Sequence, residues 1–151
     1  MGMKKKVLIG LAVMLVATLA FVPAVSAEGP RDGTLTAHGD GVAALAGRGS
    51  VEISGRGILW FRDVAGDARW TVSGYGEKRE FSNGWIEYLG FHGNFEATGS
   101  RIIVVLSGND IDLWAQGRGR FFLWGEGEYQ LGPRHGNWST EGEVLTLAPV
   151  E

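Results

Sequence analysis

The chain has 151 residues and a formal net charge of −3, and it contains 25 glycines, four prolines and no cysteine. Glycine is about twice as frequent as in an average protein, but it follows no three-residue period, which excludes a collagen triple helix. The absence of cysteine excludes disulfide bonds, cysteine-ligated zinc, iron–sulfur clusters and thiol catalysis. With 44% apolar and 21% charged residues, the composition is that of a folded chain.

The first 27 residues have the pattern of a secretory signal peptide. Three lysines at positions 4–6 precede an uncharged apolar run from Val7 to Val22, and a motif of small residues ends at Ala27. We expect cleavage after Ala27, which leaves a single β domain at residues 28–151 in the periplasm or outside the cell. No membrane span is expected once the leader is removed. The alternative is an uncleaved anchor, because the apolar run is only slightly shorter than a spanning helix.

The charge balance becomes more acidic after the expected cleavage. All 17 acidic residues lie after Ala27, whereas three of the 14 basic residues lie before it. A nucleic-acid partner, which needs a basic face, is therefore not expected.

The segment from Gly39 to Phe61 alternates strictly between two kinds of residue. Every odd position is apolar or glycine, whereas the even positions include Asp40, Arg48 and Glu52. A period of two is typical of a β-strand with one buried face, because a helix would mix the two sets on every turn.

Glycine pairs of the form Gly-x-Gly recur within this segment. They begin at Gly39, Gly47 and Gly55, one every eight residues, and the same pattern at residues 117–131 aligns with 47–61 as an internal duplication. A straight strand of this length would be too long for a small domain, so the chain must bend at each pair while keeping the parity of its buried face. These observations predict an all-β fold, a small antiparallel barrel or sandwich with strongly bent, glycine-kinked strands. The alternative is a short β-solenoid with a corner every eight residues, although its coils would be unusually small.

The rest of the chain also has a β pattern. Alternating or β-branched stretches predict strands over residues 68–73, 85–89, 101–106 and 143–147. Asn83-Gly84 is a strong turn signal, and residues 132–137 are expected to form a loop. No segment after Ala27 has a helical apolar period, so almost no helix is expected.

The sequence contains no recognisable catalytic or metal-binding motif. His38, His92 and His135 lack a second histidine at metal-ligand spacing, and neither a nucleophile elbow nor a phosphate-binding loop is present. With 17 acidic residues, some carboxylate pair will have a suitable spacing for glycoside hydrolysis by chance. We therefore expect no catalytic residue, no metal and no cofactor.

The candidate binding residues occupy even positions, opposite the glycine-rich face. They are Trp60, Trp114, Arg118, Arg120 and Trp124. Flat aromatic rings beside arginines and carboxylates suit stacking on sugar rings or recognition of another polar polymer. Two alternatives stay open: this face packs on a second sheet or on loops, as large tryptophans often do, or it contacts a protein partner.

Together, these features predict a secreted, non-enzymatic β domain with a binding or structural role at the cell envelope. A glycan or another envelope component is the candidate partner. The first alternative is a small secreted hydrolase that uses Asp and Glu carboxylates, which needs a pocket with two carboxylates, one of them desolvated. The second is a self-assembling structural subunit that pairs through an exposed strand edge. The sequence leaves the ligand and the oligomeric state open.

Overall fold

Six β-strands form the part of the chain that the structure describes. The computed structural model describes residues 33–148, so the predicted signal peptide at residues 1–27 lies outside the described residues. The strands are β1 (Gly33–Asp63), β2 (Arg69–Ser73), β3 (Glu77–Glu80), β4 (Trp85–Leu131), β5 (Arg134–Asn137) and β6 (Glu143–Leu147). All six belong to one antiparallel sheet. Residues 33–148 contain no helix, and therefore none that could cross a membrane.

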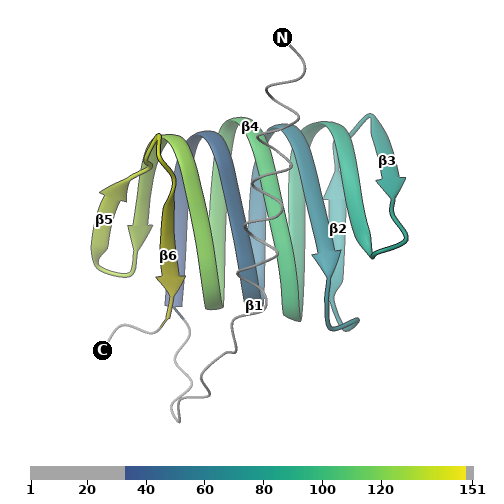
Figure 1. Cartoon of the computed structure of the whole chain (residues 1–151), viewed down its shortest axis with the longest axis horizontal. Helices are drawn as coiled ribbons and strands as arrows, with labels where there is room; N and C mark the ends of the chain where they lie inside the picture. Colours follow the sequence, from purple (N-terminus) through teal and green to yellow (C-terminus); the bar gives the residue numbers. More distant parts are fainter. Residues whose placement is uncertain (1–32, 149–151) are drawn as a thin grey trace.

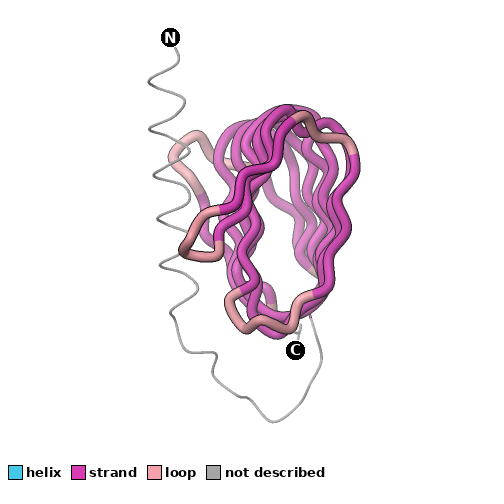
Figure 2. The backbone as a smooth tube through the Cα atoms, turned by 90° about the vertical axis from the view of Figure 1, so that its right-hand side faces the viewer, coloured by secondary structure: helices cyan, strands magenta, loops and turns pink. Residues whose placement is uncertain are grey.

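The two long strands, β1 and β4, wind around each other as a coil. Most residues of β1 pair with two residues of β4: Leu35 pairs with both Ala115 and Leu131, and the two partners of any β1 residue lie 16 to 18 positions apart. β1 therefore lies between successive turns of β4, and the two strands alternate across the molecule in Figure 1. Seen along the coil in Figure 2, the sheet is a flattened tube with two long walls joined by bends.

The predicted all-β class with antiparallel, strongly bent strands is confirmed. The sheet is not closed edge to edge, and its two walls face each other across a core as the sheets of a sandwich do (Figure 2). It reaches this arrangement by coiling, which is the feature of the solenoid alternative. Coils of this small size are stable here because two antiparallel strands wind together, and each satisfies the backbone hydrogen bonds of the other.

The glycine pairs form the bends between the walls. Gly49 pairs with Gly117, and Gly47 pairs with Gly119, so the two copies of the repeated glycine pattern meet at one corner. A Cβ atom on Gly49 would overlap the carbonyl oxygen of Gln116 and lie 2.8 Å from the Cα of Gly117. Gly49 also has a φ of +131°, which side-chain-bearing residues rarely adopt. Glycine is therefore required at this corner both by the backbone conformation and by the close approach of the neighbouring strand.

The register assigns each stretch of strand to one of the two walls. Wall A consists of residues 42–46, 58–62, 85–89, 102–107 and 119–124, with β3 and β6. Wall B consists of residues 33–38, 50–54, 94–98, 111–116 and 128–131, with β2 and β5. Successive eight-residue stretches of β1 thus alternate between the walls.

The main hydrophobic core fills the space between the walls. The ring centroids of Phe61, from wall A, and Phe95, from wall B, lie 5.1 Å apart, and both side chains are fully buried. Trp138 packs against the same core, and its indole nitrogen donates a hydrogen bond of 3.1 Å to the carbonyl oxygen of Glu128. The odd positions of β1 contribute Leu35, Leu45, Val51, Ile53 and Leu59 to this core, as the alternation predicts.

Three local details compare with the predictions as follows. The turn at Asn83-Gly84 is confirmed, because it joins β3 to β4. The predicted loop at residues 132–137 is wrong: residues 134–137 form β5, whose backbone pairs with residues 128–131 and continues the coil. The strand predicted over residues 101–106 does not end there, because β4 continues through the polar residues 107–110. At Asp110 the backbone has a φ of +53°, and the pairing register between β1 and β4 shifts nearby. The side chains that point into the core are therefore even-numbered before the shift, as at Leu106, and odd-numbered after it, as at Ile111.

Candidate functional site

The outer surface of wall B is a regular polar array. Because neighbouring strands are in register, outward side chains from successive strands form rows across the wall. One row runs Gln130, Thr36, Trp114, Glu52, Glu96 and Thr71. The neighbouring row runs Asn137, Glu128, His38, Asp112, Ser54, Asn94 and Ser73. Most of these side chains are exposed, whereas Trp114 is half-buried among them.

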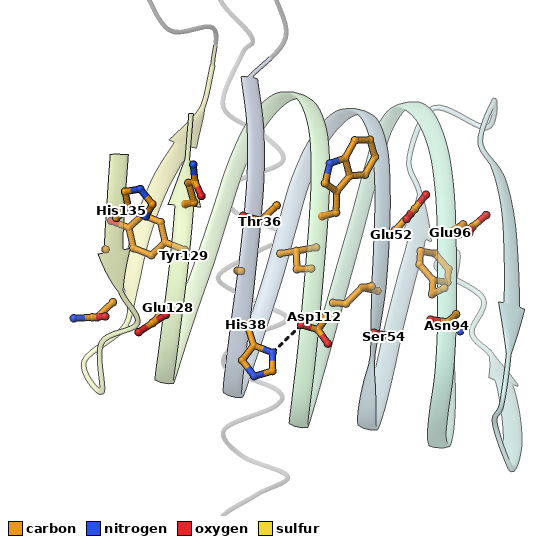
Figure 3. Close-up of a pocket in the computed structure, with 18 residues that line it drawn as sticks. Thr36, His38, Glu52, Ser54, Asn94, Glu96, Asp112, Glu128, Tyr129 and His135 are labelled. Carbon is orange, nitrogen blue, oxygen red and sulfur yellow. Dashed lines mark hydrogen bonds and ion pairs between the residues drawn. The ribbon is translucent and has the colours of Figure 1, made fainter. Parts of the chain in front are cut away.

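A hydrogen-bonded ion pair lies near the middle of the second row. The Nδ1 atom of His38 lies 2.7 Å from an oxygen of Asp112 on the neighbouring strand, as the dashed line in Figure 3 shows. The hydrogen bond that His38 donates to Asp112 raises the pKa of His38 above its ordinary value, and the negative charges of Asp112, Asp110 and Asp40 add to the effect. His38 therefore carries a positive charge over a wider pH range than a free histidine does.

These rows line an open groove along wall B with a volume of about 840 Å³. Figure 3 shows its labelled side chains spread over several neighbouring strands, from Glu96 at one end to Tyr129 and His135 at the other. The hydroxyl of Tyr129 lies 3.5 Å from a carboxylate oxygen of Glu143. Burial, followed by the negative charge of Glu143, raises the pKa of Tyr129, so this side chain stays a neutral hydrogen-bonding group. A groove that crosses several strands suits an extended ligand better than a single small molecule.

The structure separates the five residues that the sequence placed on one face. Trp114 lies in the groove of wall B. Trp60, Arg120 and Trp124 point outward from wall A, and Arg118 lies at a corner opposite Arg48. All five occupy even positions because their side chains point outward from the coil. The chain passes from one wall to the other at each glycine corner, so outward side chains on either side of a corner lie on different walls.

Several groove residues were not identified from the sequence. They include Thr36, His38, Glu52, Glu96, Asp112 and Glu128. A usable signal was present in β1, because even positions are polar at 34–38 and again at 50–54 but apolar at 42–46. These two polar stretches are sixteen residues apart, which is two corner spacings. That spacing predicts that they lie on the same wall.

The outer surface of wall A has the opposite character. It carries an apolar face, which we call face A, formed by Val42, Ala44, Ala46, Trp60, Trp85, Ile103, Val105, Phe122 and Trp124. Trp60 stacks on Phe81 at 5.7 Å and meets the edge of Trp85 at 6.4 Å. Glu87 lies beside Trp60 in the register and is only 7% exposed, and burial raises the pKa of its carboxyl group.

Within residues 33–148, no group of three or more histidine, aspartate and glutamate side chains is arranged to hold a metal ion. No protein-family model, curated protein or solved structure matches the chain.

Proposed function

We propose that this protein is a secreted, non-enzymatic β domain that binds an extended glycan of the cell envelope in the groove of wall B. The observation that carries the proposal is the position of Trp114. Its half-buried ring lies between Thr36 and Glu52 in a groove lined with exposed hydrogen-bonding groups. An aromatic ring supplies a stacking surface for a sugar ring, and flanking polar groups supply hydrogen bonds to its hydroxyls.

The charge of the groove indicates which glycans it would accept. Glu52, Glu96, Asp112 and Glu128 line it, and the only nearby positive charge in its central rows is that of protonated His38. Like charges repel, so polysaccharides that carry carboxylates or phosphates are disfavoured. We therefore propose a neutral or amine-bearing polysaccharide as the ligand.

The same carboxylates favour binding over hydrolysis. A general acid for glycoside hydrolysis is desolvated so that it keeps its proton near neutral pH. The four groove carboxylates are exposed to solvent, and the buried Glu87 lies on the opposite wall. The residues that could cut a glycan thus lack the environment that the hydrolase alternative needs.

The test is affinity electrophoresis of the purified protein in gels that contain a neutral glucan, chitosan or alginate. We expect retardation by the glucan or chitosan and none by alginate. Trp114→Ala should weaken the retardation at least about tenfold, as loss of an aromatic anchor in a binding site does, and Trp114→Phe should restore part of it. Trp124→Ala, which removes the same side chain from the opposite wall, is the matched control and should bind as the wild type does.

The charge of the preferred glycan can be tested separately. Glu52→Gln combined with Glu96→Gln should weaken binding to chitosan more than binding to the neutral glucan, because only chitosan presents amines to these carboxylates. Circular dichroism should show an unchanged fold for each variant. Lack of retardation by any of the polymers, or equal retardation of the wild type and Trp114→Ala, would overturn the proposal.

A further inference from the structure

The sheet ends in two edge strands at each end of the coil. β2 and β3 lie at one end, and β5 and β6 lie at the other (Figure 1). Each of these strands pairs with a stretch of β4 on one side, and no other described strand pairs with its second side. Because an edge strand presents unpaired backbone N–H and C=O groups, its side chains decide whether another chain can pair with it.

β3 is protected against such pairing by its charges. Its sequence is Glu-Lys-Arg-Glu, and all four side chains are exposed. Lys78 lies opposite Tyr88, a residue of the core, so it points toward the core side of the sheet. On the same side it forms an ion pair of 3.0 Å with Glu80. A strand added to β3 would bury both charges, and inward-pointing charges are one way in which proteins prevent association between sheet edges.

β6 has the opposite character. Its sequence, Glu-Val-Leu-Thr-Leu, contains one charged residue, at its start, and neither lysine nor proline. Val144 points outward and is 46% exposed, more than any other large hydrophobic side chain of the described residues. Leu145 packs against the core but is only half-buried, at the edge of wall A. β6 is therefore apolar on both faces, and nothing in its sequence protects its open side.

The chain that leads into β6 is held firmly, which keeps this edge in a fixed position. Trp138 is buried in the core, and its backbone N–H donates a hydrogen bond of 2.9 Å to the carbonyl oxygen of Gly127. The carbonyl oxygen of Ser139 accepts a hydrogen bond of 3.0 Å from the backbone N–H of Gly125. A partner that pairs with β6 would therefore meet a strand that is already ordered, so little conformational entropy would be lost on binding.

We propose that β6 pairs antiparallel with β6 of a second copy of this chain, so that two domains form a dimer with a continuous wall A. The antiparallel stretches of wall A are odd in number, so β3 and β6 run in the same direction. A head-to-tail contact between β6 and β3 of the next copy would be parallel, and it would bring Lys78 against Leu145. Two β6 strands related by a two-fold axis avoid both costs.

The sequence of β6 is complementary to itself in this arrangement. Outward residues must oppose outward residues, so Val144 lies opposite Thr146 of the partner subunit, and Leu145 lies opposite its own equivalent. This register pairs all five residues of β6, covers Leu145, and brings no two like charges opposite each other. Self-complementarity is what a symmetric interface requires, and it favours a second copy over an unrelated extended peptide.

The dimer has a consequence for the groove of wall B. A continuous wall A places the two copies of wall B on the same side of the dimer, so both grooves face the same way. A surface that carries many glycan chains would then be held by two sites at once, which raises the overall affinity. The dimer does not require the groove to bind a glycan, so the two proposals can fail separately.

The test is light scattering after size-exclusion chromatography of the secreted protein, with its N-terminus established by intact mass. At rising concentration we expect the mass of two chains. Val144→Lys, which places a charge on the exposed face of the edge, should weaken the dimer at least tenfold and shift the mass to that of one chain. Thr71→Lys, which adds the same charge to an exposed position of edge strand β2, is the matched control and should stay dimeric.

Single cysteines test the register of the dimer. Val144→Cys and Thr146→Cys each carry one thiol, so a disulfide can form only between two chains. Their equilibrated mixture should yield a disulfide-linked dimer with one chain of each variant, and either variant alone should yield much less. A wild type that stays monomeric at every concentration would overturn the proposal. So would a dimer that Val144→Lys leaves intact or that Thr71→Lys dissociates, or equal crosslinking of the mixture and of the single variants.

Discussion

Walls A and B are built from the same two strands with the same alternation, yet their outer surfaces have opposite chemistry. In β1, the outward residues of wall A are Val42, Ala44 and Ala46, and eight residues later those of wall B are Ser50, Glu52 and Ser54. The first group is buried in an apolar cluster with tryptophans, whereas Glu52 lines an open polar groove. A single glycine corner, at Gly47 and Gly49, separates them.

The difference shows that two periods operate together in this chain. The two-residue period decides whether a side chain points into the core or outward, as in any half-buried strand. The eight-residue spacing of the corners then decides on which wall an outward side chain lies. Residues 16 to 18 positions apart on β4 share a wall because both pair with the same residue of β1. The domain can therefore present two unlike surfaces while using one core.

The largest expected effect follows from disrupting the corner that divides the walls. Gly49→Val should prevent folding or lower the free energy of unfolding by at least about 3 kcal/mol, because its side chain would meet the backbone of Gln116 and Gly117 at a φ of +131°. Denaturant unfolding measures the loss.

Gly66 provides the matched control for that change. It too has a positive φ, +82°, but a Cβ atom at this position would meet no atom within 4 Å. Gly66→Ala should therefore cost only the backbone strain, about 1 kcal/mol. Equal losses in the two variants would show that the contact between strands does not define the corner.

A smaller effect distinguishes the carboxylates of the two walls. The folded-state pKa of Glu87 is raised by burial, so the native state holds this proton more tightly than the unfolded chain, and stability falls as the pH rises through the raised value. Glu87→Gln should therefore have a higher melting temperature than the wild type at pH 7, and the gain should vanish near about pH 3, where the wild-type carboxyl is protonated in both states.

The corresponding change on wall B is Glu96→Gln. Its side chain is exposed, so the substitution should move stability by no more than about 0.5 kcal/mol at either pH. Thermal unfolding followed by circular dichroism at both pH values makes the comparison. A lower melting temperature of Glu87→Gln at pH 7 would contradict the assignment of Glu87 to a desolvating surface.

The smallest effect concerns the ion pair in the groove. Asp112→Asn should lower the pKa of His38 toward its ordinary value, which an NMR titration of the ring measures. Because the pKa of His38 is higher in the folded protein than in the unfolded chain, the ion pair stabilises the fold at pH values below the unfolded-state pKa. This contribution is lost as the pH rises through the folded-state pKa. Because both side chains are exposed, the melting temperature should change little at any pH. An unchanged titration of His38 would show that the 2.7 Å contact is absent in solution.

Much of the fold could be predicted from the residues, because β alternation and paired glycines have direct physical meanings. The odd positions from Gly39 to Phe61 are inward or at corners, and the bends occur at the glycine pairs. The number of residues per turn could not be predicted, because it depends on which distant strands pair. The register shift near Asp110 could not be predicted either, because it depends on one residue with a positive φ inside β4.

The candidate site was predicted only in part, for the same reason. Trp114 was named from the sequence, and the structure places it among polar side chains in the groove of wall B. Trp60 and Trp124 also occupy even positions and point outward, but an even position does not show on which wall an outward side chain lies. From the sequence, residues of a polar groove and of an apolar face were therefore placed on one surface. The apolar even positions at 42, 44 and 46 were the signal that separates them.

The most direct test of the coil is disulfide crosslinking in this naturally cysteine-free chain. Ser50 pairs with both Thr98 and Gln116, and its hydroxyl lies 3.0 Å from that of Thr98. Ser50→Cys should therefore form a disulfide within one molecule when combined with either Thr98→Cys or Gln116→Cys, as intact mass under oxidising conditions would show. Ser50→Cys with Thr146→Cys, on the outer surface of the opposite wall, should stay reduced. Crosslinking of the Ser50–Thr146 pair, with neither of the other two formed, would contradict a β1 strand that lies between successive turns of β4.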